Sequence, residues 1–471
     1  MIKKIHLALL FICFTCNLFS QSIPPVVTQA VRYGSTGLDR PFNFRKDASG
    51  NMYLTGRFTG TITFGSYTLT SAGADVFVVK MNPDGSVVWA KNCGGSGYDN
   101  AGDVAIDAAG NVYITGDFRG TAVFGSTTLT SASNANNIFV AKLSPSGNWI
   151  WAQKAGSNGG EASQGVAVDQ NGNVFITGTY YGNCAFGSIT ILNSSSNYDC
   201  FIAKLDAAGS WQWAKRITGS GREFGRNIQV DLANNIYVSG FGNSSMTTQE
   251  GNFLSRGIFL VKYNTTGNEI WRRSVSCDNV NEHSDIAIDN DNGFIYVASG
   301  FSGSMSTGSF STNATNSNIF VAKYDLNNTF QWAALANGPG SEYLHRISLS
   351  EQKDLLISGY FWSGAARFGT TTVTGNTSSY NNPYLAKIDK NGNWMWARTF
   401  ANTSNCIANQ VLENGSENYV VAGSFVSSVT MDGLTLTSTG GDDVFVTTLQ
   451  CPPAIKVDSV QSCDSYTWID G

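Results

Sequence analysis

The chain repeats one short phrase seven times, at intervals of about 60 residues. The clearest copy reads DAAGNVYITGDF and spans residues 107–118. The other copies, some of them weaker, span 47–58, 169–180, 231–242, 289–301, 351–361 and 414–425. Self-similarity at a fixed period is typical of repeat architectures, in which each unit buries its apolar surface against its neighbours. We therefore expect one large repeat domain in this chain of 471 residues.

Each unit contains four segments that are typical of β-strands. The repeated phrase is followed by a second one, which reads NIFVAK at 137–142, and in six units by a third, which reads WIWA at 149–152. A further, inner strand such as 103–107 precedes them. The segments are short, rich in β-branched and aromatic residues, and bounded by Gly, Asn, Asp and Ser. Apolar residues occupy both faces of these strands, as in a propeller blade that is covered by a blade on either side.

The two ends of the chain complement each other. The seventh unit lacks the Trp phrase, because Leu449 runs directly into the tail. Residues 24–37 stand before the first unit at the spacing of such a phrase and its loop. The sequence therefore predicts an all-β fold, a seven-bladed β-propeller over residues 21–450 with four strands per blade. Residues 25–31 are expected to close the ring as the outer strand of blade seven, which leaves no open sheet edge.

An insertion between the second and third strands has its own recurring pattern. It reads GTITFGSYTLTS at 60–71, GTAVFGSTTLTS at 120–131 and GNCAFGSITILN at 182–193. We expect each copy to form a short hairpin anchored by Phe64, Phe124 or Phe186. The hairpins share one rim with the loops that join successive blades. This rim holds most of the loop residues, and loops are where functional sites concentrate.

The first 20 residues are expected to be a secretory signal. Lys3 and Lys4 precede an apolar run over 5–14, which is too short to span a bilayer as a helix. Cleavage after Ser20 would leave Gln21 as the new N-terminus. The expected localisation is secreted or at the cell surface, where disulfides are permitted.

Composition narrows the range of partners. Only 13% of residues are charged, the net charge is −5 and no basic run is present, so nucleic acid is not an expected partner. No apolar run after the signal approaches the roughly 20 residues of a transmembrane helix. We expect a monomeric propeller without a transmembrane segment, whose partner is an extracellular protein or glycan. No motif for a cofactor or a metal ion is present.

The phrases GNVYITG, NIFVAKL and WIWA, in units of about 60 residues, resemble the SBBP-type bacterial β-propeller repeats. The resemblance covers residues 25–449 and all units. It implies an exported protein whose family has no shared enzymatic activity; the large hairpins depart from the family pattern. The tail QSCDSYTWIDG (461–471) resembles the opening of a Cys-containing repeat in multidomain surface proteins that use the type IX secretion route. Residues 451–471 are therefore expected to begin a further C-terminal repeat or domain that is truncated here.

An acidic residue recurs shortly before the inner strand of most units. The set is Asp39, Asp99, Glu161, Glu223, Glu342 and, one residue out of register, Glu282. Such a set could surround one mouth of the central channel, where clustered carboxylates would suit a cation or a cationic ligand. The alternative is structural: each acid accepts backbone N–H groups in a tight Gly-rich loop. Recurrence in so many units favours the structural interpretation.

A lysine recurs at the end of the third strand. The set is Lys80, Lys142, Lys204, Lys262, Lys323 and Lys387. It lies on the opposite rim, near turn acids such as Asp107, and ion pairs between blades explain it better than an anion site does. On the same rim, DNDNG at 289–293 suggests calcium. However, it lacks the downstream bidentate Glu of a calcium loop and matches the usual turn.

Seven cysteines remain in the chain after the signal. Cys184 and Cys200 flank the hairpin of the third unit on neighbouring strands, so a local disulfide between them is a candidate. Cys451 and Cys463 form a second candidate pair in the tail. The other cysteines fall in different blades and are expected to be free thiols.

Catalytic motifs are scarce in this sequence. After the signal it has two histidines, His283 and His345, and it has no G-x-S-x-G, H-E-x-x-H or C-x-x-C motif. We assign no catalytic residue and predict a non-catalytic binding or scaffolding module of an exported surface protein, for adhesion or for glycan or protein binding. Two alternatives stay open. One is an extracellular polysaccharide-active enzyme that uses carboxylates at the loop-rich mouth of the channel, and the other is a rigid structural spacer.

Overall fold

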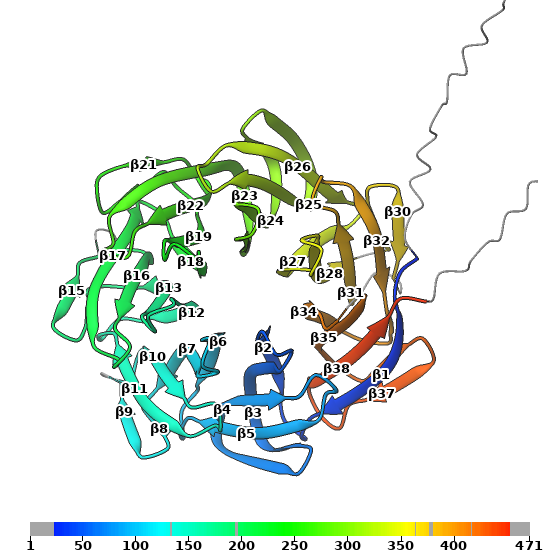
Figure 1. The fold of residues 1–471 in the computed structure, drawn as a ribbon, viewed down its shortest axis with the longest axis horizontal. Coiled ribbons are helices and arrows are strands. Elements are labelled where there is room, and N and C mark those ends of the chain that lie inside the picture. Colours follow the sequence, from blue (N-terminus) through cyan, green and yellow to red (C-terminus); the bar gives the residue numbers. More distant parts are fainter. Residues whose placement is uncertain are drawn as a thin grey trace, which may run out of the picture.

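The computed structural model describes residues 23–452, apart from 132–133, 194–195, 363, 376–379 and 416. The described part consists of strands, turns and loops, without a helix. Its antiparallel sheets stand around a central axis, each with one edge toward the axis and the other at the periphery (Figure 1). This is the β-propeller architecture that the repeat predicts. The expected signal (1–20) and the tail beyond residue 452 lie outside the described residues.

Strands that follow each other along the chain also pair with each other. The first sheet contains β2 (Arg40–Lys46), β3 (Met52–Phe64), β4 (Tyr67–Met81) and β5 (Val87–Cys93). The next sheet contains β6 (Asn100–Ile106), β7 (Val112–Arg119), β10 (Asn136–Leu143) and β11 (Trp149–Ala155). It is followed by β12 (Ala162–Val168), β13 (Val174–Tyr180), β16 (Asp199–Leu205) and β17 (Trp211–Gly219).

A long strand, β23 (Glu269–Asp289), connects two neighbouring sheets. Its first part pairs with β22 and its last part pairs with β24, so one strand is outermost in one sheet and innermost in the next. The strands before it are β18 (Glu223–Val230), β19 (Ile236–Gly242) and β22 (Gly257–Tyr263). Those after it are β24 (Phe294–Thr307), β25 (Phe310–Asp325) and β26 (Phe330–Asn337).

The last sheet includes the first strand of the chain. It is preceded by a sheet of β27 (Ser341–Leu349), β28 (Leu355–Trp362), β31 (Asn381–Ile388) and β32 (Trp394–Thr399). The last sheet contains β34 (Cys406–Glu413), β35 (Asn418–Phe425), β38 (Asp443–Gln450) and β1 (Val26–Tyr33). β1 lies antiparallel to β38, with Val26 opposite Gln450 and Tyr33 opposite Val444. The first and last strands therefore lie side by side at the periphery (Figure 1).

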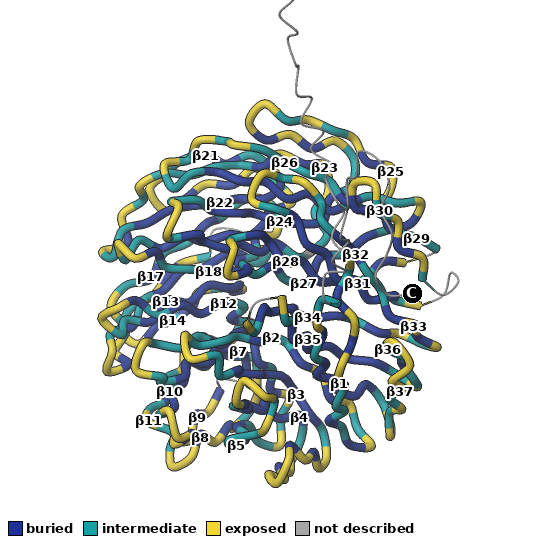
Figure 2. The backbone as a smooth tube through the Cα atoms, turned by 45° about the vertical axis from the view of Figure 1, so that its right-hand side comes forward, coloured by how far each residue is buried: buried dark blue, intermediate teal, exposed yellow. Residues whose placement is uncertain are grey.

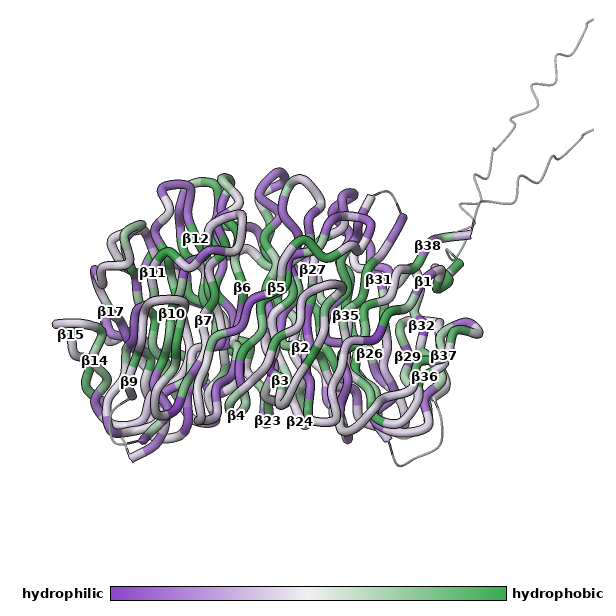
Figure 3. The backbone as a smooth tube through the Cα atoms, turned by 90° about the horizontal axis from the view of Figure 1, so that it is seen from below, coloured by the Kyte–Doolittle hydropathy of each residue, from purple (hydrophilic) through white to green (hydrophobic). Residues whose placement is uncertain are grey.

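The hydrophobic core is divided among the spaces between neighbouring sheets. One such cluster combines Tyr53 and Val78 of the first sheet with Ile114 and Phe139 of the second. Buried residues follow the strands and exposed residues gather at the loops (Figure 2). Seen from the side, hydrophobic segments fill the middle of the disc and hydrophilic segments are frequent on its rims (Figure 3). Covering both faces of each sheet explains why the strands do not alternate between polar and apolar residues.

The insertions form the expected hairpins. In the second and third units they are β8 (Thr121–Phe124) with β9 (Thr127–Thr130), and β14 (Cys184–Phe186) with β15 (Ile189–Ile191). Phe124 meets Trp149 edge-on with ring centroids 5.4 Å apart, and Phe186 meets Trp211 in the same way at 5.1 Å. In the following unit β20 (Met246–Thr248) pairs with β17, the outer strand of the preceding sheet. Hairpins of this kind therefore also connect neighbouring sheets.

A tryptophan from the outer strand of one sheet packs on a turn of the next sheet, a contact that we call the tryptophan latch. The indole N–H of Trp89 donates to the carbonyl oxygen of Pro145, with an N···O distance of 3.0 Å. Gly147 lies in the same turn with φ +80°, and a Cβ there would come within 2.8 Å of the indole. Trp151 packs on the turn of Gly209 without the hydrogen bond, which recurs at three further tryptophans of the described residues. Trp213, Trp271 and Trp332 donate to the carbonyls of Thr265, Leu326 and Lys390.

The recurring lysines support the same contact. Lys204 Nζ donates to the carbonyl of Thr265 at 3.1 Å, the oxygen that also accepts from Trp213. Several of these ammonium groups also lie over aromatic rings, and this arrangement stabilises the positive charge of the lysine side chain. Among the described residues, two of the lysines form ion pairs: Lys262 with Asp231, and Lys387 with Asp354. The lysines do link neighbouring sheets, but mainly through backbone carbonyls rather than through the expected ring of ion pairs.

We predict that Trp89→Ala lowers the free energy of unfolding by about 3–5 kcal/mol, because it removes a buried aromatic side chain together with its hydrogen bond to Pro145. The measurement is a urea unfolding curve at pH 7. Trp362→Ala is the matched control, since this side chain is 51% exposed at the end of β28. Equal effects of the two substitutions would contradict a structural role for the latch.

Candidate functional site

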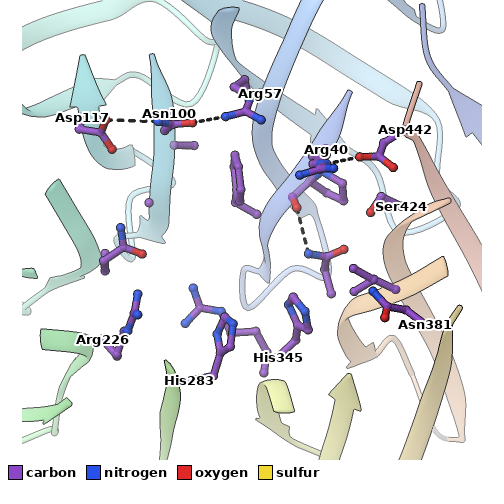
Figure 4. Close-up of a pocket in the computed structure, with 18 of the residues that line it drawn as sticks. Arg40, Arg57, Asn100, Asp117, Arg226, His283, His345, Asn381, Ser424 and Asp442 are labelled. Carbon is purple, nitrogen blue, oxygen red and sulfur yellow. Dashed lines mark hydrogen bonds and ion pairs between the residues drawn. The ribbon is translucent and has the colours of Figure 1, made fainter. Parts of the chain in front are cut away.

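A cavity of about 640 Å³ lies at the mouth of the central channel, where the inner strands begin. Side chains from the inner part of every sheet contribute to it (Figure 4). The labelled residues in this view are Arg40, Arg57, Asn100, Asp117, Arg226, His283, His345, Asn381, Ser424 and Asp442. This is the rim with the hairpins and the loops between sheets, the rim on which the sequence predicts a functional site.

β-Bulges in the inner strands supply much of the lining. In β2, for example, the pairing with β3 skips one residue between Pro41 and Asn43. The residues that fall within such irregularities and line the cavity are Phe42, Gly102, Gln164, Arg226, His283, His345 and Asn409. A bulge changes the direction of its side chain, and bulges are frequent near functional sites. The backbone feature repeats from sheet to sheet, whereas the side chain that it presents does not.

Arg57 is held at the cavity by aromatic and amide groups. It is only 7% exposed, and its guanidinium lies 4.4 Å from the ring centroid of Tyr98 and 5.8 Å from that of Phe42. Its Nη1 donates to Asn100 Oδ1 at 2.6 Å. Within the described part of the chain, Arg57 forms no ion pair. A fixed guanidinium without a carboxylate partner is well suited to bind an anionic group of a ligand.

Arg226 occupies another side of the opening (Figure 4). Its guanidinium lies 5.3 Å from the ring centroids of both Phe224 and Phe241. Those two rings are themselves stacked, with centroids 5.0 Å apart. Stacking on aromatic faces limits the motion of the side chain at the opening.

The cavity has an excess of positive charge. Its lining contains four arginines, Arg40, Arg57, Arg226 and Arg346, and two aspartates, Asp117 and Asp442. Asp442 forms an ion pair with Arg40, and Arg346 forms one with Asp285, a buried residue that is not part of the lining. The whole chain carries a net charge of −5, so the cavity is positive within an acidic protein.

The two histidines lie beside each other in the cavity, with ring centroids 4.9 Å apart. Burial lowers the pKa of His345 to about 4, and the neighbouring Arg346 acts in the same direction. Burial, His345 and the nearby arginines also hold the pKa of His283 well below its usual value. Both imidazoles are therefore neutral near pH 7 and offer hydrogen-bonding nitrogens rather than charge.

Asp117 is the carboxylate of the cavity that titrates near neutrality. Burial raises its pKa to about 7, against the opposing effect of a hydrogen bond from Asn100. Asn100 donates to Asp117 Oδ2 at 3.2 Å and accepts from Arg57, so it connects the acid with the arginine. As the pH falls through about 7, Asp117 becomes neutral and the cavity becomes more positive.

The recurring acids do not line this cavity. Asp39, Asp99, Glu161, Glu223 and Glu342 are all buried with at most 1% exposure. Asp99 accepts the backbone N–H of Gly95 at 2.9 Å and that of Arg119 at 3.1 Å, and Asp39 accepts two backbone N–H groups in the same way. Glu161 and Glu223 accept from side chains, whereas the carboxylate of Glu342 is buried without a hydrogen-bond partner in the described part of the chain. The backbone contacts of Asp39 and Asp99 match the structural interpretation, in which the acid organises a loop. The side chain of Glu282 lies outside the described residues.

These acids are also too dispersed to form the tentative cation site. They are distributed one to a sheet. Among the described residues, no three His, Cys, Asp or Glu side chains come together in an arrangement that could hold a metal ion. Asp289 serves its turn instead, accepting from the backbone N–H and the side-chain amide of Asn292.

The disulfide expected between Cys184 and Cys200 does not form. Both are buried free thiols. They belong to different core clusters: Cys184 packs with Tyr180 and Phe186, and Cys200 packs with Ile228 of the following sheet. The two thiols therefore face different neighbours. Cys451 is also free, and Cys463 lies outside the described residues.

Of the residues that line the cavity, only His283 and His345 stand out in the sequence, as the histidines that a catalytic triad would need. The other lining residues could have been found in the sequence from the differences between repeats. At the bulge position of the inner strand the side chain differs between units, with Phe42, Gln164 and Arg226 in equivalent places. To find these residues one needs the register in which neighbouring strands pair, and the sequence pattern determines that register only to within one or two residues.

Comparison with protein-family models finds no match. An uncharacterized WD repeat-containing protein of Acanthamoeba polyphaga mimivirus is 21% identical over 508 residues, covering 86% of this chain and 36% of that protein. The regulatory protein FlaEY of Caulobacter vibrioides is 25% identical over 168 residues, covering 34% and 18%. The chain thus spans about a third or less of the length of these relatives. Among solved structures, the Hadza microbial sialidase Hz136 superposes with a TM-score of 0.35 at 11% identity, covering 91% of this chain and 97% of that one.

The buried acids predict that stability falls as the pH rises. Burial raises the pKa of Asp99 to about 6 and that of Glu342 to about 8. Between the unfolded pKa near 4 and these values, the folded protein binds more protons than the unfolded chain does, so the free energy of unfolding decreases with increasing pH. The low pKa values of His283 and His345 act in the opposite direction only below about pH 6.5, so the acids are tested above it: the urea midpoint is expected to be lower at pH 8 than at pH 7.

Glu342→Gln tests the origin of this pH dependence. It removes the charge that burial disfavours, so it should raise the urea midpoint at pH 8 and change it little at pH 5. Glu417→Gln, at an exposed position, is the control and should leave both midpoints unchanged. A loss of stability at pH 8 in Glu342→Gln would show that its carboxylate makes a favourable interaction when ionised.

Proposed function

We propose that the chain is a non-catalytic binding module whose channel cavity takes an anionic group of an extracellular ligand. The observation that carries this proposal is the positive cavity within an acidic protein. Arginine recognises carboxylate, sulfate and phosphate groups through parallel N–H donors. A cavity of about 640 Å³ falls within the range of small-ligand sites.

Binding without catalysis is favoured by the state of the cavity carboxylates. Glycoside hydrolysis generally needs two carboxyl groups that flank the scissile bond. Asp442 is engaged with Arg40, which leaves Asp117 as the carboxyl group of the lining that is free of an ion pair. The pKa of Asp117, about 7, would suit a general acid, and this single feature supports the alternative of a polysaccharide-active enzyme.

We further propose that the module works outside the cell, as part of a surface protein of the SBBP-type, type IX class. The support is the signal pattern of residues 1–20 and the resemblance of the repeats and the tail. The described residues contain no helix of the length and apolarity needed to cross a membrane. In this setting, an anion-binding propeller would serve adhesion or hold a glycan or protein at the cell surface.

The ring itself we propose to be seven blades closed by β1. The pairing of β1 with β38 supports this, as do the ion pairs Arg32–Asp443 and Arg40–Asp442, which join the N-terminal segment to the last sheet. Asn409 Nδ2 also donates to the carbonyl of Pro41 at 3.0 Å, across the junction of the first and last sheets.

If the cavity binds an anionic group, acidic polysaccharides should retain the protein and neutral polysaccharides should not. The full chain is incubated with polygalacturonate, chondroitin sulfate and dextran, and both retention and released oligosaccharide are measured. Arg57→Gln should weaken binding to the acidic polymers by about tenfold or more, since a hydrogen bond to a charged group contributes ~1.5–3 kcal/mol.

Arg367→Gln is the control for that experiment, because this arginine is exposed on a hairpin away from the cavity. Equal retention of wild type and Arg57→Gln would contradict the cavity as the site. Oligosaccharide release that disappears in Asp117→Asn would favour the enzyme. Failure to retain any polymer would favour the rigid spacer.

Closure predicts that a chain beginning at residue 34 is strongly destabilised, because β38 would become an open edge next to exposed core residues. A synthetic peptide of residues 24–33 should restore its thermal midpoint toward that of the intact chain. A truncated chain as stable as the intact one would contradict a closing role for β1.

A further inference from the structure

A second hollow lies beside the channel cavity on the same rim. It is a groove of about 270 Å³ between the sheet of β7 and β10 and the sheet of β12, β13 and β16. We call it the side groove. Arg119, Asn134 and Asn136 line one side, and Thr179 and Tyr198 line the other. Arg119 is exposed, and its Nε donates to the carbonyl of Asn134 at 2.7 Å.

Tyr198 belongs to a row of aromatic rings that leads toward the channel. Its ring centroid lies 5.6 Å from that of Tyr181 and 6.3 Å from that of Phe224, the latter in a stacked arrangement. Phe224 in turn carries the guanidinium of Arg226, which lines the channel cavity. Tyr181, at the outer end of the row, is 43% exposed. A row of rings thus extends from the surface of the rim to an arginine of the cavity.

The side groove and the cavity are also connected by polar groups. Asn136 lines the groove, and its Nδ2 donates to Asp117 Oδ2 at 3.0 Å. Asp117 lines the cavity and accepts a second hydrogen bond from Asn100. The two hollows are therefore adjacent, separated by these hydrogen-bonded side chains.

The chemistry of the side groove fits a sugar ring. A pyranose has hydroxyl groups around its edge and C–H groups on its faces. The groove offers an aromatic side chain, two side-chain amides, a threonine hydroxyl and an arginine, which match these two kinds of surface. Glu161, one of the recurring acids, also lines it, but its carboxylate is buried and accepts from Asn137 and Ser157. A short peptide strand would need an open sheet edge for backbone pairing, and the groove lies between two sheets rather than at such an edge.

We propose that the ligand is an acidic glycan of at least two sugars. Its carboxylate or sulfate enters the channel cavity, and an adjoining sugar lies in the side groove against Tyr198. This inference rests on the proposed function, because it needs the cavity to bind an anion. It adds that the ligand is a chain, and that the groove determines how tightly the chain binds relative to a single acidic sugar.

The test compares ligands of increasing length on the full chain by titration calorimetry. The probes are galacturonate, trigalacturonate, a chondroitin sulfate tetrasaccharide and polyglutamate. In the wild type at least one acidic oligosaccharide should bind tenfold or more tightly than galacturonate. Tyr198→Leu and Tyr181→Ala should remove most of that gain, so that the oligosaccharide binds little more tightly than galacturonate. Tyr181 is exposed, so its variant keeps the test valid if the Tyr198 variant folds poorly.

Tyr67→Leu, an exposed tyrosine on the hairpin of the first sheet, is the matched control and should not alter binding. Unchanged oligosaccharide affinity in both groove variants, with a loss in Arg57→Gln, would overturn this inference and leave the proposed function standing. Polyglutamate that binds as tightly as the oligosaccharides, with the same dependence on Tyr198, would overturn the glycan in favour of an acidic peptide. Absence of binding by every probe would overturn the proposed function as well.

Discussion

The contact between a tryptophan of one sheet and a turn of the next is the interaction on which the ring depends. A single sheet of this protein has two apolar faces and cannot be stable alone, so the position of each sheet relative to its neighbour must be specified. The latch does this with one aromatic side chain, one hydrogen bond and one residue with positive φ. Gly147 leaves no room for a Cβ beside Trp89, which explains why the turn and the tryptophan recur together. Asn328, also at positive φ, stands in the corresponding turn of the sheet that Trp271 contacts.

Because these contacts between sheets are made elsewhere, the residue types at the inner edges of the sheets can vary. Latches, lysines and hairpins act at the outer strands and rims, whereas bulges in the innermost strands supply much of the cavity lining. A bulge needs no particular side chain, because its geometry is a property of the backbone. The same strand can therefore present Phe42 in one sheet and Arg226 in another without loss of packing. In such a protein, positions that differ between repeats are better indicators of function than positions that recur.

That distinction decides what the sequence could predict. The strands, the propeller architecture and the hairpins with Phe124 and Phe186 follow from period and residue type, which the sequence contains directly. The location of the recurring acids was harder to predict. Recurrence indicates that these side chains make a shared structural contact, but it does not tell whether they point into the channel or into a loop. Asp99 points into a loop. The prediction of a Cys184–Cys200 disulfide was wrong, because a position on neighbouring strands does not reveal toward which face of the sheet each side chain points. The cavity arginines depend on strand register in the same way.

The electrostatics of the rim follow from these placements. The recurring acids are buried, and burial raises the pKa of their carboxyl groups, so part of the negative charge of the rim is reduced near neutral pH. Burial lowers the pKa of Arg57, and the aromatic rings beside Arg57 and Arg226 compensate part of the desolvation of these two guanidinium groups. An acidic protein can in this way hold a positive cavity. The field at the channel mouth is then determined by a few arginines and by the protonation of Asp117, whose carboxyl group is connected through Asn100 to Arg57.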